Sequence, residues 1–378
     1  MRHLLLPLLA VALFAMAPSG PAEAQPVAAP RAQDHDPMDE AVARGLRFLE
    51  QAQNADGSWS SNGGGMAFQP GFGRPAVGRG GGDPAISALA VMAFLSAGHV
   101  PNEGPFGEVV ARGVRYVAQR QNGDNGLFSA ANPGREMYQH GICTLMLAEV
   151  IGMTDGRTAE ELRERLEAAV RVILAAQRTR AGNDRGGWRY QVQGFDADLS
   201  VAGWQLMALR AAKNVGCDVP DDRIDAAVQY VKRCHDPLSG GYRYTAMGGV
   251  TVPCTGVGVL ALELCGKEYH RSEEALRAGA YLLKTPLQPG GLYFFYGVYY
   301  TSQAMFQLGD NYWKGYREKL HGLLLRAAGP QVDGSWGRGT ADAAHGLAYC
   351  TAMAVLALTV EYRFLPIYQR FEEPQERD

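Results

Sequence analysis

Amphipathic segments alternate with more uniformly apolar ones along most of the chain. In the first amphipathic segment, residues 38–53, Val42, Leu46 and Leu49 fall on one face of a helix. A helix with one apolar face belongs at a surface, whereas a helix that is apolar on all sides is buried. The pattern predicts outer helices at 38–53, 108–121, 159–178, 222–234, 273–284 and 318–328. It predicts inner helices at 85–97, 141–151, 199–214, 254–265, 300–308 and 349–362.

A turn that ends in glycine followed by an aromatic residue comes after each predicted outer helix. The first turn is QNADGSW at 53–59, and the sixth is QVDGSW at 331–336. Degenerate copies end at Phe128, Trp188, Tyr242 and Tyr293. Regular recurrence of a two-helix unit is typical of repeat architectures, and closing them into a ring removes the need for capping repeats. We therefore expect an all-α fold: a single α/α toroid, a six-fold barrel of inner and outer helices built from six two-helix repeats.

The N-terminal segment has the pattern of a secretory signal peptide. Arg2 and His3 precede an uncharged run at 4–17, and AEA at 22–24 provides a cleavage site. A retained anchor is the alternative. We expect an exported protein, periplasmic or secreted, with no integral membrane segment after signal removal. Its parts are a signal peptide at 1–24, a disordered leader at 25–37, the toroid at 38–369 and a polar tail at 370–378.

The net charge of the chain argues against nucleic acid as its general partner. The formal net charge is −3 over 378 residues, and a general nucleic-acid binder would show a basic balance instead. The 47% hydrophobic content suits a globular protein with a sizeable core. The six cysteines permit disulfides in an exported protein, and Cys217 and Cys265 are one candidate pair. The sequence names no protein partner.

The repeated turn resembles a known motif. QNADGSW and its copies are similar to the QW repeat of squalene–hopene cyclases, although Gln331 stands only two residues before Asp333 in the sixth copy. The order of inner and outer helices resembles the α/α toroid of terpene cyclases and of protein prenyltransferase β subunits. Full-length triterpene cyclases have two such domains, and this chain has material for one. The resemblance covers 38–369 and implies an elongated apolar ligand, such as an isoprenoid, bound at one end of the barrel.

The resemblance also points to an acid motif. DADL at 196–199 is similar to the D-x-D-D stretch of squalene–hopene cyclases, with Leu199 in place of the final aspartate. It implies that Asp198, assisted by Asp196, is a catalytic acid. However, Asp198 also directly precedes a predicted inner helix, as Asp83 does, and aspartate there is a common N-cap. The two hypotheses differ in where the carboxyl points, and we favour the cap.

A metal site is a further implication of the resemblance. Protein prenyltransferases bind zinc through an aspartate, a cysteine two residues later and a distant histidine. VPC at 252–254 is similar to the aspartate and cysteine stretch, with Val252 in place of the aspartate. YCT at 349–351 is similar to the histidine stretch, with Cys350 in place of the histidine. The resemblance thus makes Cys254 and Cys350 candidate zinc ligands. Additional ligands could come from His140, His235 or His345. Small buried cysteines without a metal are the structural alternative.

Aromatic and arginine side chains gather at the end of the barrel where the turns and the inner-helix N-termini are expected. Tyrosine and tryptophan faces attract cations, and guanidinium groups bind diphosphates and carboxylates. Core packing and ion pairs between repeats are the alternatives. The candidate ligand-binding residues are Trp188, Arg189, Tyr190, Trp204, Tyr242, Arg243, Tyr244, Tyr296 and Tyr300.

Three functions are consistent with this sequence. The first is binding of an elongated apolar ligand in the mouth of the barrel, with cyclase-like catalysis; it requires an apolar cavity there. The second is a carbohydrate-active enzyme, which requires two carboxyl groups about 5–10 Å apart in an aromatic cleft. The third is a non-catalytic interaction protein of the cell envelope, which would have a filled centre and no pocket.

Overall fold

The computed structural model describes residues 36–61, 82–129, 134–154, 156–327 and 329–369. The predicted signal peptide at 1–24 and polar tail at 370–378 lie outside the described residues, as does the leader up to residue 35. The first helix begins at Pro37, and its N-cap Asp36 accepts a hydrogen bond from the Met38 N–H at 2.9 Å. None of the helices in these ranges is long and apolar enough to cross a membrane.

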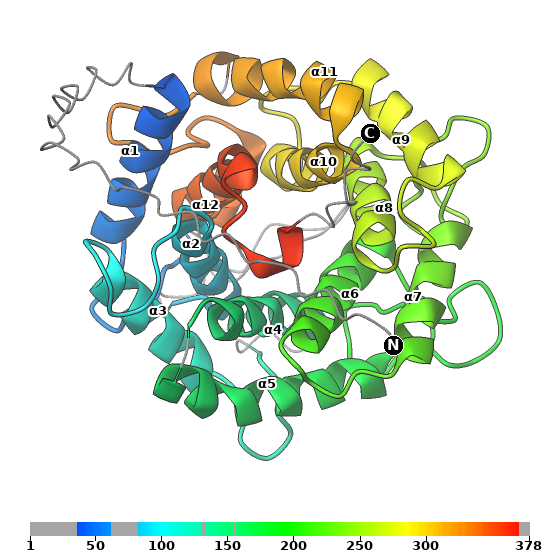
Figure 1. Cartoon of the computed structure of the whole chain (residues 1–378), viewed down its shortest axis with the longest axis horizontal. Helices are drawn as coiled ribbons and strands as arrows, with labels where there is room; N and C mark the ends of the chain where they lie inside the picture. Colours follow the sequence, from blue (N-terminus) through cyan, green and yellow to red (C-terminus); the bar gives the residue numbers. More distant parts are fainter. Residues whose placement is uncertain (1–35, 62–81, 130–133, 155, 328, 370–378) are drawn as a thin grey trace, which may run out of the picture. The chain divides into compact units, whose positions relative to one another are not determined.

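Twelve α-helices and no named strand occur in the described residues of the unit that starts at Asp36. The odd-numbered helices lie outside the even-numbered ones (Figure 1). The outer helices are α1 (Pro37–Gln51), α3 (Gly107–Gln119), α5 (Gly156–Ala176), α7 (Asp221–Arg233), α9 (Glu273–Lys284) and α11 (Asp310–His321). The inner helices are α2 (Pro84–Ser96), α4 (Glu136–Met153), α6 (Leu199–Asn214), α8 (Val252–Leu264), α10 (Phe294–Leu308) and α12 (Leu347–Leu358). The predicted all-α class is confirmed.

The inner helices form a closed ring, because each packs on the next and α12 packs on α2. The outer ring closes at the same place: an Arg44 side-chain N–H donates to the Gln331 carbonyl at 2.5 Å. Gly45 lies so close to the Trp336 ring that a Cβ there would come within 2.8 Å of it. The α/α toroid is therefore confirmed, and the count of six sequence repeats stays a prediction.

Three helices begin well before their predicted starts. α10 begins at Phe294 rather than 300, because the two carboxylate oxygens of Asp342 accept hydrogen bonds from the Tyr293 and Phe295 N–H groups, both at 2.9 Å. That cap comes from a distant part of the chain, so no local signal marks it. α4 begins at Glu136 rather than 141, and α11 at Asp310 rather than 318. A π-helical segment, Gly322–Ala327, continues α11.

A glutamine amide connects each of the first three turns to the following outer helix. The Gln53 Nε2 donates to the Gly57 carbonyl at 3.0 Å and to the Val109 carbonyl of α3 at 2.9 Å. Gln121 and Gln177 make the same pair of hydrogen bonds to their own turn and to the next outer helix. One side chain thus satisfies two backbone carbonyls and sets the position of neighbouring repeats.

The turn aromatics connect the outer and inner rings. The indole N–H groups of Trp59, Trp188 and Trp336 donate to carbonyls of the preceding outer segment at 2.7, 2.8 and 3.0 Å. The backbone N–H of four turn aromatics donates to a side chain of the following inner helix; these acceptors are Ser87, His140, Thr255 and Thr351. The three tryptophans are completely buried. The turns of Trp59 and Trp336 make both contacts, and each of these two turns therefore joins the outer and the inner helix of its own repeat.

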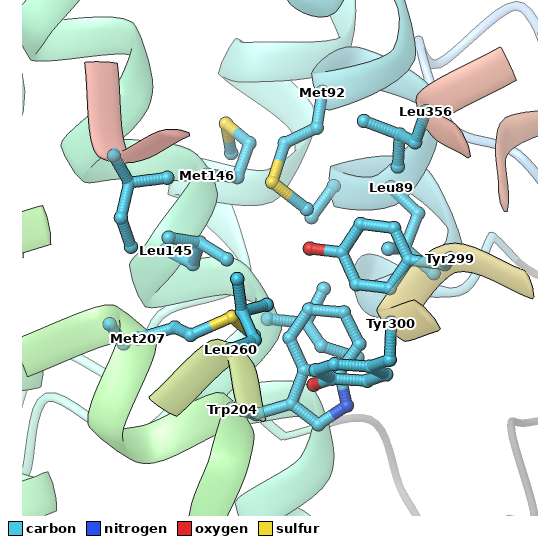
Figure 2. Close-up of a cluster of buried hydrophobic side chains, with 14 of the residues drawn as sticks. Leu89, Met92, Leu145, Met146, Trp204, Met207, Leu260, Tyr299, Tyr300 and Leu356 are labelled. Carbon is cyan, nitrogen blue, oxygen red and sulfur yellow. The ribbon is translucent and has the colours of Figure 1, made fainter. Parts of the chain in front are cut away.

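The interior of the inner ring is filled by side chains (Figure 2). Leu89, Met92, Leu145, Met146, Trp204, Met207, Leu260, Tyr299, Tyr300 and Leu356 form part of this cluster, and all are at most 3% exposed. After α12 the chain forms two short 3-10 segments, Thr359–Tyr362 and η4 (Pro366–Tyr368). η4 packs on α4 and α6, inside the ring.

The turn glycines yield a stability test. Gly57 has φ +87°, and a Cβ there would lie 2.5 Å from the Arg112 carbonyl oxygen of α3. Gly290, the left-handed glycine of the fifth turn, has φ +78° with open space around it. Alanine in this backbone region costs about 1–2 kcal/mol. We expect Gly290→Ala to lower the free energy of unfolding by about that amount, and Gly57→Ala by roughly 1–3 kcal/mol more because of the clash. Urea denaturation of both variants checks this, and equal losses would contradict it.

Candidate functional site

A pocket of about 350 Å³ opens where the N-terminal ends of four inner helices meet. We call it the mouth pocket. Its lining comes from the first turns of α4, α6, α8 and α10 and from the connections that precede α8 and α10. The lining residues are Tyr138, Ser200, Tyr244, Gly249, Thr251, Pro253, Cys254, Leu292, Tyr293 and Tyr296. Four of the ten lining residues are tyrosines, and six of the ten carry a hydroxyl group.

The hydroxyl groups around the mouth pocket bond to one another. The Tyr138 and Ser200 hydroxyls share a hydrogen bond, and the Tyr190 and Tyr244 hydroxyls share another at 2.5 Å. The Tyr138 and Tyr190 rings stack with their centroids 5.8 Å apart. Burial raises the pKa of the Tyr138, Tyr190 and Tyr244 phenols, so all three are neutral at physiological pH. This part of the wall therefore carries no phenolate charge.

Asp198 is the N-cap of α6, as the capping hypothesis predicts. Its Oδ1 accepts hydrogen bonds from the Val201 N–H at 2.9 Å and from the Ser200 hydroxyl at 2.6 Å. The side chain is completely buried and lies behind Ser200 rather than in the pocket lining. Burial raises the pKa of Asp198 to about 6, while the hydrogen bonds from Ser200 and Val201 act in the opposite direction. Its catalytic role stays a prediction.

Arg189 holds both aspartates of the predicted acid motif. Its guanidinium lies 2.8 Å from Asp196 Oδ2 and 3.4 Å from Asp198 Oδ2. It also stacks over the Tyr190 ring, 5.0 Å from the centroid. Asp196 is largely exposed, whereas Asp198 is buried. The two carboxyl groups therefore share one cation outside the pocket lining, and they do not face each other across it.

The structure separates the predicted ligand-binding residues into two groups. Tyr244 and Tyr296 line the mouth pocket, and Arg189 and Tyr190 lie beside it. The others are not in the lining: Trp188 and Tyr242 are buried turn aromatics, Trp204 and Tyr300 belong to the filled interior, and Arg243 forms an ion pair with Asp236 at 2.6 Å.

Sequence reasoning missed most of the other lining residues. Tyr138 and Ser200 occupy the first turns of inner helices, where the predicted geometry already places the mouth. Thr251, Leu292 and Tyr293 belong to connections whose path depends on tertiary contacts. Ser200 could have been found by listing the residues at each predicted inner-helix N-terminus. Tyr138 could not, because it precedes the predicted start of its helix at 141, and neither could the last three.

The candidate zinc ligands are buried thiols. Cys254 lines the mouth pocket, whereas Cys350 packs beneath Gly337, where a Cβ would meet its sulfur at 2.5 Å. Burial raises the pKa of Cys254 to about 12 and also raises that of Cys350, which disfavours the thiolates that zinc binds. Within the described ranges, no group of three or more His, Cys, Asp and Glu side chains could hold a metal ion.

His140, one of the three candidate histidines, has a structural role. His140 Nδ1 accepts a hydrogen bond from the Phe128 N–H at 3.1 Å, and its Nε2 lies 3.0 Å from the Ala169 carbonyl oxygen. Burial lowers the pKa of His140 to about 4, so the ring is neutral. All six cysteines are free thiols, which means that the candidate pair Cys217 and Cys265 is not bonded.

The pKa of Asp198 leads to a pH test. The folded-state pKa is raised from 3.8 to about 6, which means that the fold favours the protonated carboxyl. The stability that this contributes is fully present below pH 3.8 and is lost as pH rises through 6. Asparagine caps helices well and does not titrate. We therefore expect the stability of Asp198→Asn, relative to the parent protein, to increase by about 2 kcal/mol between pH 4 and pH 7.5.

Asp333→Asn is the matched control for this measurement. The Ser335 hydrogen bonds and Arg338 outweigh burial and hold the pKa of Asp333 at about 2, so its carboxylate is ionised over the whole range. We expect its stability difference from the parent protein to be nearly constant from pH 4 to 7.5. Denaturation curves at several pH values measure both differences. A constant difference for Asp198→Asn would contradict the assignment.

Solved structures of other proteins share this fold. No family model matches the chain, and no curated protein matches it by sequence. Among solved structures, the type II terpene cyclase MstE from Scytonema is 15% identical, with a TM-score of 0.56 over 87% of this chain and 99% of that one. The Candida albicans protein geranylgeranyltransferase-I complexed with GGPP is 14% identical, with a TM-score of 0.50 over 87% and 95%.

A glycoside hydrolase also shares the architecture. The family 76 mannosidase from Bacteroides thetaiotaomicron is 12% identical, with a TM-score of 0.57 over 86% of this chain and all of that one. Identities at this level establish a common fold and no common reaction. The protein thus has a terpene cyclase-like and prenyltransferase-like α/α toroid, a fold that the family 76 mannosidase shares.

Proposed function

We propose that the mouth pocket binds an elongated apolar molecule of the isoprenoid class. The observation that carries this proposal is the lining: four tyrosines, Leu292, Pro253 and Cys254 surround about 350 Å³. Small-molecule pockets measure about 300–1,000 Å³ and are lined mainly by apolar and aromatic side chains. The isoprenoid class comes from two proteins that share the fold, the terpene cyclase and the geranylgeranyltransferase complexed with GGPP.

Several polar groups of the pocket wall are already hydrogen-bonded within the protein, which favours an apolar ligand over a sugar. Tyr138, Ser200 and Tyr244 direct their hydroxyls into hydrogen bonds within the protein. A glycosidase needs two carboxyl groups that flank its substrate, and neither Asp196 nor Asp198 is a lining residue. Carbohydrate hydrolysis, which the mannosidase fold relative raises, is therefore the second candidate and one outcome of the test below.

The interaction-protein hypothesis fits only part of the structure. It expects a filled centre, and the inner ring is filled (Figure 2). It does not expect the mouth pocket.

We further propose that the protein acts outside the cytoplasm. This rests on the signal-peptide pattern at 1–24, with its basic start, apolar run and cleavage site.

A cyclase-like reaction in this pocket would use Asp198 as the acid. The Ser200 hydroxyl donates to Asp198 at 2.6 Å and shares a hydrogen bond with Tyr138, and both hydroxyls line the pocket. When Asp198 is protonated, its O–H would donate to the Ser200 oxygen, and the Ser200 hydroxyl proton would move on to the substrate, directly or through the Tyr138 hydroxyl, so each hydroxyl gains one proton and gives one up. The surrounding tyrosine faces would stabilise the resulting cation. Incubation with squalene and shorter polyprenols tests this. Cyclised product that Asp198→Asn abolishes at unchanged stability supports an acid; product that persists leaves Asp198 as a cap.

Two exposed leucines give a matched pair for testing binding. Leu292 lines the mouth pocket and is 60% exposed, whereas Leu238 is 92% exposed and lies outside it. Contact with an apolar chain contributes about 25 cal/mol per Å² of buried surface. We expect Leu292→Asp to weaken binding of geranylgeraniol about tenfold and Leu238→Asp to leave it unchanged, as measured by titration calorimetry.

The same titrations separate the candidate functions. Farnesol, geranylgeraniol and squalene represent the isoprenoid class, and mannose oligosaccharides represent the sugar class. Binding of an isoprenoid that Leu292→Asp weakens selectively supports the proposal. Binding of mannose oligosaccharides alone would favour the carbohydrate function. Equal effects of the two leucine substitutions would place the ligand outside the mouth pocket and overturn the proposal.

A further inference from the structure

The C-terminal segment Leu365–Tyr368 closes the end of the inner ring opposite the mouth pocket. Leu365, Ile367 and Tyr368 are each 3% exposed, although they follow the last inner helix. η4 packs on α4 and α6 and lies within the ring in the axial view (Figure 1). Its contacts include Glu149 and Gln307, both near the C-terminal ends of inner helices. We call this segment the plug.

Three polar contacts hold the plug. The Gln307 amide donates to the Tyr368 carbonyl at 2.7 Å. The Tyr299 and Tyr368 hydroxyls share a hydrogen bond in the interior. The Ile367 N–H donates to Oε2 of Glu149 at 3.3 Å. A carboxyl on an inner helix therefore receives the plug backbone directly, so its charge bears on whether the plug stays in place.

Glu149 has no cationic partner in the part of the chain that the structure describes. The side chain is 1% exposed and forms no salt bridge there. The titratable groups that face it are Tyr299 of α10 and Tyr368 of the plug, and burial raises the pKa of both phenols. Burial raises the pKa of Glu149 to about 8 and outweighs the hydrogen bond from the Ile367 N–H, which favours the carboxylate.

We propose that Leu365–Tyr368 is a pH-sensitive plug whose docking requires the neutral acid form of Glu149. Docking is tightest in acid and weakens with rising pH, because a water-exposed Glu149 in the undocked state ionises readily. The window runs from the ordinary glutamate pKa, 4.5, where the stabilisation is fully present, up to about 8, where it is lost. This device does not depend on what the mouth pocket binds.

Release of the plug would change the interior of the ring. The Tyr368 hydroxyl lies 3.6 Å from Met207 Sδ, and Met207 belongs to the buried cluster of Figure 2. Methionine side chains fill irregular gaps, so Met207 would repack into the space that Tyr368 leaves. Arg363, with φ +57°, stands just before the plug in a backbone region that disfavours non-glycine residues. It is the natural hinge for such a movement.

Hydrogen–deuterium exchange between pH 5 and pH 9 tests the proposal. Exchange of a peptide that covers 365–369 is corrected for the intrinsic pH dependence and compared with a reference peptide from α8. For a single proton, we expect the protection of the plug to fall by up to about tenfold per pH unit from 5 to 8 and to level off above 8. A constant protection in this range would overturn the proposal.

Substitutions assign the effect to one carboxyl. Glu149→Gln keeps the shape and an acceptor oxygen, and we expect it to remove the pH dependence. If the glutamine variant does not fold, Glu149→Leu, which also lacks a carboxyl, is measured in its place. Glu263→Gln is the control, because Glu263 is a buried acid of α8 that contacts His270 and Arg271 instead of the plug. The same decline in a Glu149 variant as in the parent protein would overturn the proposal.

Discussion

The arrangement of the first repeats depends on the hydrogen bonds that a glutamine amide makes between one turn and the next outer helix. Gln53, Gln121 and Gln177 each donate to a carbonyl of their own turn and to a carbonyl of the following repeat. The left-handed glycines allow the turn backbone to approach that helix closely. In these repeats the contact sets the position of each outer helix relative to the turn before it, and the alternation of outer and inner helices places the inner-helix N-termini at one end.

Much of the fold could be predicted from the sequence because its determinants are local. Amphipathic periodicity and the glycine–aromatic turns place most helices within a few residues, and α9 matches its predicted limits. The start of α10 could not be predicted, since Asp342 caps it from a later segment. For the same reason, Leu292 and Tyr293 were missed as lining residues. A capping residue from a distant part of the same chain leaves no signal in the sequence near the helix that it stabilises.

The candidate site shows a similar division. Aspartate before an inner helix signals a cap, and Asp198 is one. Its depth behind Ser200 and the sharing of Arg189 with Asp196 follow from packing that local sequence does not encode. Four of the nine predicted ligand-binding residues lie in or beside the mouth pocket, namely Arg189, Tyr190, Tyr244 and Tyr296. The rings of the turn aromatics instead pack in the interface between helices.

The closure of the ring has a consequence for how the chain reaches its native state. Arg44 must meet Gln331, and Gly45 must meet Trp336, across almost the whole length of the domain. Contacts between residues so far apart in sequence slow folding, because a large loop has to be closed first. Until the last repeat has emerged, the growing protein is an open arc whose two ends expose apolar helix faces. We expect this exposed apolar surface to make the incomplete ring prone to aggregation.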